Sequence, residues 1–124
     1  MLGLARECRL LCGIDLGWCG VIVSLVRFRS KLSDDDVQAT FEDRAERYRS
    51  VPGLVEKIYL RFRETGEFGA VYVWDSEQAL MSFRNTELAR TIPDVYQVAE
   101  PPRAELADVC LVIQPDINRS TVSP

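Results

Sequence analysis

The stretch VPGLVEKIYLRFRETGEFGAVYVWDS, residues 51–76, holds two strand signals separated by a turn signal. Residues 54–63 alternate apolar with mixed side chains, which is typical of an edge strand with one apolar face. Residues 69–74 are apolar on both faces, which is typical of a strand in the centre of a sheet. Residues 64–67, Glu-Thr-Gly-Glu, supply turn chemistry between the two. The stretch therefore predicts a β-hairpin with one edge strand and one central strand.

Strand and helix signals flank this hairpin on both sides. Residues 21–29 are rich in β-branched side chains and predict another central strand. Residues 33–50 predict a helix that Ser33 caps, because acidic residues fill its first turn and Pro52 follows its end. Four apolar side chains recur on one face of this helix: Val37, Phe41, Ala45 and Tyr48. The remaining charge-rich positions predict a solvated face.

The C-terminal half repeats the alternation of helix and strand. A second helix begins near Asp75 or Ser76 and is interrupted at residues 85–86, with a short continuation that ends at Ile92 before Pro93. A loop then leads to a fourth strand over residues 104–114, in which Cys110 is expected as a small buried side chain.

The resulting order β-α-β-β-α-β predicts an α+β, ferredoxin-like fold with a four-stranded antiparallel sheet. Right-handed crossovers place the first and third strands in the centre, and these are the two strands that are apolar on both faces. We expect one domain over residues 21–114, an N-terminal extension over residues 1–20 and a C-terminal tail over residues 115–124.

The predicted sheet has a face that its own two helices cannot cover. An extended apolar patch is unusual on a soluble monomer, so the simplest cover is a second copy packed sheet against sheet, as in a dimeric α+β barrel. We therefore expect a homodimer. The competing interpretation is a monomer in which residues 1–20 cover that face.

Composition limits the partners and the chemistry. The net charge of −4 does not favour nucleic acid or an anionic membrane, and the longest uncharged run is too short to span a bilayer, so we expect a cytoplasmic protein. The chain has no histidine, which excludes a Ser-His-Asp triad and any His-containing metal site. The spacing of Cys8, Cys12 and Cys19 does not fit a zinc site, so no metal is expected.

At residues 51–76 the chain resembles a known family, the YdhR-like monooxygenases of the dimeric α+β barrel superfamily, relatives of the antibiotic-biosynthesis monooxygenases. The resemblance runs over about residues 21–113. It rests on a Pro-Gly entry to the second strand, a Lys and a Tyr on that strand, a Thr-Gly turn and a Tyr-x-Trp in the third strand. These are Pro52, Gly53, Lys57, Tyr59, Thr65, Gly66, Tyr72 and Trp74.

The resemblance implies a pocket between sheet and helices that oxidises a small phenolic or polyketide-like aromatic molecule with O₂ and without a cofactor. Catalytic roles would fall to Lys57, Tyr59 and Tyr72, which can bind or polarise a developing anion. The walls that bind the aromatic ring would come from three further side chains: Trp74, Phe28 and Phe83. Haem degradation is disfavoured, because the second helix lacks the histidine of the haem-degrading relatives. The alternative is a non-catalytic barrel that binds an apolar ligand or serves a structural role.

Overall fold

The computed structural model describes residues 20–115. In chain order the elements are β1 (Ile22–Phe28), α2 (Asp34–Tyr48), β2 (Leu54–Arg61), β3 (Phe68–Trp74), α3 (Glu77–Arg84), α4 (Glu87–Arg90), α5 (Ile92–Val95) and β4 (Arg103–Asp108). The four strands form one antiparallel sheet in the order β2-β3-β1-β4. The predicted α+β ferredoxin-like fold is confirmed, and so is the central position of β1 and β3.

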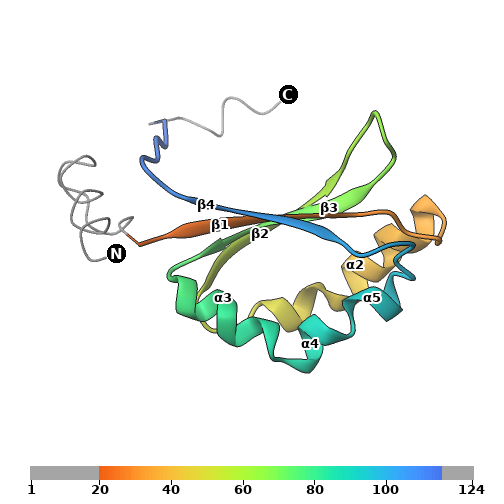
Figure 1. Ribbon diagram of the computed structural model, residues 1–124, viewed down its shortest axis with the longest axis horizontal. Helices are drawn as coiled ribbons and strands as arrows, with labels where there is room; N and C mark the ends of the chain where they lie inside the picture. Colours follow the sequence, from red (N-terminus) through yellow and green to blue (C-terminus); the bar gives the residue numbers. More distant parts are fainter. Residues whose placement is uncertain (1–19, 116–124) are drawn as a thin grey trace.

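All four helices lie on the same side of the sheet (Figure 1). The side chains that β1 and β3 direct toward the helices form the core, and they include Ile22, Phe28, Tyr72 and Trp74. The described residues place no helix on the opposite face, where Ile58 of β2 is 44% exposed. Within the described residues, the helices therefore leave one face of the sheet uncovered, as the sequence predicts.

Helix α2 begins where its sequence predicts. The side-chain oxygen of Ser33 accepts a hydrogen bond from the backbone N–H of Asp36 at 3.1 Å, which satisfies one donor of the first turn. Four side chains of this helix are buried: Val37, Phe41, Arg44 and Tyr48. The predicted apolar face holds for Val37, Phe41 and Tyr48, while Ala45 is only half-buried. The prediction that all charged positions of this helix are solvated is wrong for Arg44, which is 4% exposed.

The turn into β2 depends on Gly53. Its φ of +80° lies in the left-handed region, and a Cβ at this position would overlap the side chain of Ala79 on α3. The Gly53 carbonyl accepts a hydrogen bond from the N–H of Asp75 at 2.8 Å, which ties the start of β2 to the end of β3. Glycine at this position therefore lets β2 and α3 pack closely.

Two predicted boundaries differ from the structure. Pro93 does not end the helical region but begins α5, because a proline in the first turn of a helix lacks only an N–H that would be unpaired there. Strand β4 ends at Asp108 rather than at residue 114, because its partner β1 begins at Ile22, the residue opposite Asp108. Cys110 consequently lies beyond the strand and is exposed, so its predicted burial in the sheet is wrong.

The N-terminal extension and its cysteines Cys8, Cys12 and Cys19 lie outside the described residues. Within residues 20–115 no helix is long and apolar enough to cross a membrane. The same residues contain no group of three or more Cys, Asp or Glu side chains placed to hold a metal ion.

Candidate functional site

Strand β2 directs Lys57 and Tyr59 toward the helices. A β-bulge between Leu54 and Glu56 shifts the register, after which Lys57 is opposite Tyr72 and Tyr59 is opposite Ala70. Tyr72 and Ala70 belong to the core, so Lys57 and Tyr59 lie on the covered face. Ile58 and Leu60 therefore occupy the opposite, uncovered face.

Lys57 lies in a cage of tyrosine rings. Its Nζ is 3.2 Å from the ring centroid of Tyr48 on α2, 4.4 Å from that of Tyr59 and 4.6 Å from that of Tyr72. Burial, and secondarily the positive charge of Arg44, lower the pKa of Lys57 to about 6. The ring faces act in the opposite sense because they attract an ammonium group. With a pKa of about 6, the amine is mostly neutral at pH 7.

Arg44 supplies a buried positive charge above this cage. Its Nη2 donates to the carbonyl of Leu88 at 2.8 Å and to the Thr91 hydroxyl at 3.3 Å, so α2 is tied to α4 and its C-cap. The Nε of Arg44 is buried and has no hydrogen-bond partner among the described residues. The sequence analysis missed this residue. Its spacing of three from Phe41 and four from Tyr48 was the available signal.

The hydroxyl of Tyr59 is also buried without a hydrogen-bond partner in the described structure. Burial, with a smaller effect of the Tyr48 hydroxyl, raises the pKa of Tyr59 to about 12. Burial likewise raises the pKa of Tyr72 well above its ordinary value. Both phenols are therefore protonated at neutral pH and can donate hydrogen bonds. The neutral amine of Lys57 beside them can accept a proton.

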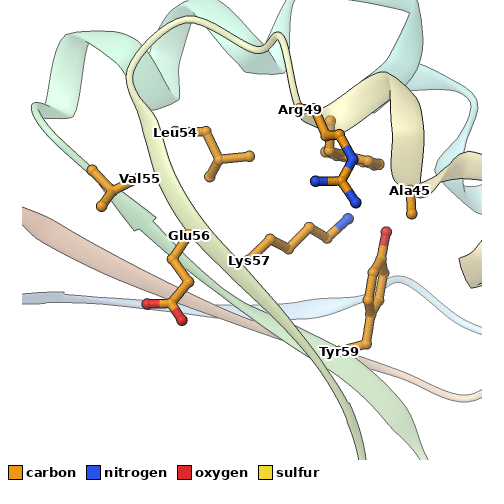
Figure 2. A pocket seen from close by; sticks show the side chains of 8 residues that line it. Ala45, Arg49, Leu54, Val55, Glu56, Lys57 and Tyr59 are labelled. Carbon is orange, nitrogen blue, oxygen red and sulfur yellow. The ribbon is translucent and has the colours of Figure 1, made fainter.

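Lys57 and Tyr59 border a cavity of about 370 Å³ between α2 and β2. Figure 2 shows Lys57 and Tyr59 extending from β2 toward Ala45 and Arg49 of α2, while Glu56 points the other way. A smaller inner cavity of about 30 Å³ lies behind them, and it is bordered by Lys57, Tyr59 and Tyr72. We call Lys57, Tyr59, Tyr48, Tyr72 and Arg44 the Lys57 site.

The remaining predicted residues lie deeper in the core. Trp74 is 0% exposed and stacks on Tyr72 with ring centroids 5.8 Å apart, while Phe83 packs against both rings. With Leu80 and Ile22, Trp74 and Phe83 form what we call the Trp74 cluster. Trp74, Phe83 and Tyr72 border a cavity of about 160 Å³ beneath α3.

Phe28 lies in a different part of the core, where its ring centroid is 5.2 Å from that of Tyr96, and it borders the 30 Å³ cavity. The six predicted site residues thus lie between the sheet and the helices that cover it, but they are divided among three cavities. Their chemical roles stay predictions.

Family and structure comparisons agree with this architecture. Residues 24–98 match the family described as "Putative mono-oxygenase ydhR", and the chain belongs to this family. The family resemblance seen at residues 51–76 is thereby confirmed. None of the curated proteins compared with the chain matches it.

Solved structures with the same fold include a protein from Caulobacter crescentus described as a putative antibiotic biosynthesis monooxygenase. It is 19% identical with a TM-score of 0.63, over 76% of this chain and 93% of that one. SnoaB, a cofactor-independent oxygenase from Streptomyces nogalater, is 16% identical with a TM-score of 0.60, over 73% of this chain and 93% of its own. At these identities the likeness establishes the shared fold.

Proposed function

We propose that the chain is a cofactor-independent monooxygenase that acts on a small phenolic aromatic molecule in the 370 Å³ cavity. The observation that carries the proposal is the pairing of a desolvated amine at Lys57 with the unpartnered, protonated hydroxyl of Tyr59 beside that cavity. Two titratable groups whose pKa values are displaced in opposite directions define a base and a hydrogen-bond donor.

In the proposed reaction, the phenolic hydroxyl of the substrate (the enol form of an anthrone) gives its proton to the Nζ of Lys57, and the hydroxyl of Tyr59 donates a hydrogen bond to the resulting phenolate. The electron-rich phenolate then reduces O₂. The substrate itself supplies all the electrons: the ring C–H para to the phenolate becomes a C=O, the phenolate carbon becomes the other C=O of the quinone, one atom of O₂ enters the product, and the other leaves in water with the C–H hydrogen and the phenolic proton. The chain needs to bind the anion, orient it and exclude water.

The other predicted residues support these groups. Tyr72 contributes a second phenol beside Lys57, and its ring stacks on Trp74. In this proposal Trp74, Phe83 and Phe28 form the apolar wall behind the reacting groups, next to the two inner cavities. An apolar environment strengthens the interaction between the anion and its hydrogen-bond donors.

Oxygen uptake with an anthrone as substrate tests the function. Wild-type protein should consume O₂ and release the corresponding quinone, whereas Lys57→Met and Tyr59→Phe should slow consumption by roughly a hundredfold. Lys31→Met is the matched control, because it removes the exposed second lysine and should leave the rate unchanged. Binding of phenols without oxygen uptake by the wild type would instead favour the non-catalytic binding protein.

We also propose that the uncovered face of the sheet packs against a second copy of the chain. Half-buried aliphatic side chains of β1 and β3, including Leu25 and Val71, line this face beside the exposed Ile58 of β2. Sedimentation equilibrium should give twice the chain mass for the wild type and the monomer mass for Ile58→Glu.

Met81→Glu is the control for the dimer, since Met81 is 48% exposed but lies on α3, away from that face. A monomeric wild type would contradict the dimer. If a chain without residues 1–20 then became dimeric, the extension would be the cover.

A further inference from the structure

We propose that Lys57 is an imine-forming amine, so that the cavity between α2 and β2 binds aldehydes and ketones covalently through a Schiff base. This is a second chemistry at the site, distinct from oxygenation, and it needs neither O₂ nor an electron donor. The proposal stands on the position of the amine, on its surroundings and on a hydroxyl that can assist the loss of water.

The position of the amine is the first argument. Lys57 borders both the 370 Å³ cavity and the inner cavity, so its side chain is accessible from either one. The larger cavity has room for a small carbonyl compound next to the amine. The chain has only one other lysine, Lys31, which is exposed and precedes α2.

The surroundings of the amine are the second argument. A lysine becomes a nucleophile when an apolar pocket or a second cation keeps it unprotonated. Lys57 has both, because burial between α2 and β2 removes its Nζ from water and the guanidinium of Arg44 is held nearby on α2. The titratable and charged groups around the two cavities come from every element packed against Lys57: Arg44 and Tyr48 of α2, Arg49 at its C-cap, Tyr72 of β3, Tyr96 at the C-cap of α5, and Tyr59 and Glu56 of its own strand.

None of the groups that face the amine from the helix side is an anion. Glu56 borders the cavity, but Figure 2 shows its carboxylate directed away from Lys57. Arg49 is paired with Glu46 of its own helix, with 3.0 Å between Nε and the carboxylate oxygen. The electrostatic environment of Lys57 therefore favours the neutral amine, as attack on a carbonyl requires.

The hydroxyl of Tyr59 is the third argument. The lone pair of Nζ attacks the carbonyl carbon, and the carbonyl oxygen takes up a proton to give a carbinolamine. Loss of that oxygen as water, with the remaining N–H proton, leaves the C=N bond. Departure of water needs a proton donor at the oxygen. The buried hydroxyl of Tyr59 has no other hydrogen-bond partner in residues 20–115 and can fill this role.

Reductive trapping tests the proposal. The full chain is incubated under nitrogen with benzaldehyde and sodium cyanoborohydride, which reduces an imine to a stable benzylamine, and the labelled sites are found by peptide mass spectrometry. At pH 7 the labelling of Lys57 should exceed that of Lys31 by more than about tenfold, because the buried amine of Lys57 is mostly neutral there. Lys57→Arg should remove the label without increasing that at Lys31.

The pH profile and two variants separate imine chemistry from mere accessibility. Wild-type labelling of Lys57 should reach half its maximum well below pH 9, Arg44→Met should shift this midpoint upward, and Tyr59→Phe should slow labelling by roughly tenfold or more. Labelling of Lys57 no faster than that of Lys31 at pH 7 would overturn the proposal. The experiment is independent of oxygen uptake, so either proposal can fail while the other holds.

Discussion

The Lys57 site and the Trp74 cluster share one face of the same sheet, yet they are built differently. In the Trp74 cluster, aromatic rings stack on one another, and Trp74 is 0% exposed. In the Lys57 site, a lysine and an arginine lie among tyrosines, and burial displaces the pKa values of Lys57 and Tyr59. Each region holds buried polar atoms without partners in the described structure: the Nε of Arg44 and the hydroxyl of Tyr59 in the Lys57 site, and the Nε1 of Trp74 in the Trp74 cluster. Ring stacking like that of the Trp74 cluster stabilises a fold, whereas titratable groups with displaced pKa values are typical of functional sites.

The largest effect on stability is expected at the Trp74 cluster. Trp74→Ala should lower the free energy of unfolding by about 3–5 kcal/mol, because a fully buried ring is replaced by a cavity. Met81→Ala, at an exposed position of α3, should change it by no more than about 0.5 kcal/mol. Urea unfolding measures both. A loss below about 1 kcal/mol at Trp74 would show that the two regions do not differ as described.

The next effect is the pH dependence of stability that Lys57 causes. The pKa of Lys57 is about 6 in the fold against an ordinary value of 10.5, so between these values the unfolded chain binds a proton that the folded chain does not. Stability should therefore rise with pH across this window, by at most about 1.4 kcal/mol per pH unit. Below pH 6 the folded and the unfolded chain both bind this proton, so Lys57 no longer makes stability depend on pH.

Lys57→Met removes this titration, so the difference in the free energy of unfolding between wild type and variant should change steadily from pH 6 to pH 9. Lys31→Met, with its exposed side chain, provides the matched control. Parallel stability curves for wild type and Lys57→Met would show that the amine is charged in the fold.

A smaller loss of stability is expected when Arg44 is replaced. Arg44→Met leaves the carbonyl of Leu88 and the hydroxyl of Thr91 without their charged donor, which should cost about 1–3 kcal/mol. Arg47→Met is the control, since Arg47 lies on the same helix but is exposed. Equal effects of the two substitutions in thermal or urea unfolding would contradict the structural role assigned to the buried guanidinium.

The smallest effect on stability is expected at Tyr59. Tyr59→Phe removes a hydroxyl that has no partner among the described residues, so the free energy of unfolding should stay within about 1 kcal/mol of the wild type or increase. Oxygen uptake should nevertheless fall. A stability loss above about 2 kcal/mol would show that this hydroxyl is held by a structural hydrogen bond.

The sequence predicted the architecture because each element has a strong local signal. The Ser33 cap, the turn at Gly66 and the apolar centre of the sheet all have their predicted structures. Where the ends of elements depend on distant partners, local signals failed: β4 ends at Asp108, opposite Ile22 at the start of β1. The confirmed part is therefore the part that short-range chemistry determines.

The composition of the site was harder to predict. Alternation along β2 does not show which face the helices cover, and the bulge after Leu54 changes the alternation at the start of the strand. Arg44 has the spacing of a core residue, but its charge indicated a solvated position. The groups that accept hydrogen bonds from its Nη2, the carbonyl of Leu88 and the hydroxyl of Thr91, lie 44 and 47 positions later in the sequence. Such compensation by distant polar groups becomes visible only in the folded chain.

The protonation of Lys57 in the folded protein is the most direct test, because both proposals at the Lys57 site require a neutral amine. The chain has two lysines, so selective ¹³C labelling at Cε gives two NMR signals, which Lys57→Arg assigns. The Lys57 signal should titrate with a pKa of about 6 while the fold remains intact. A Lys57 signal that titrates at or above pH 10 would contradict the account, because the amine would then be an ammonium held by the three tyrosine rings.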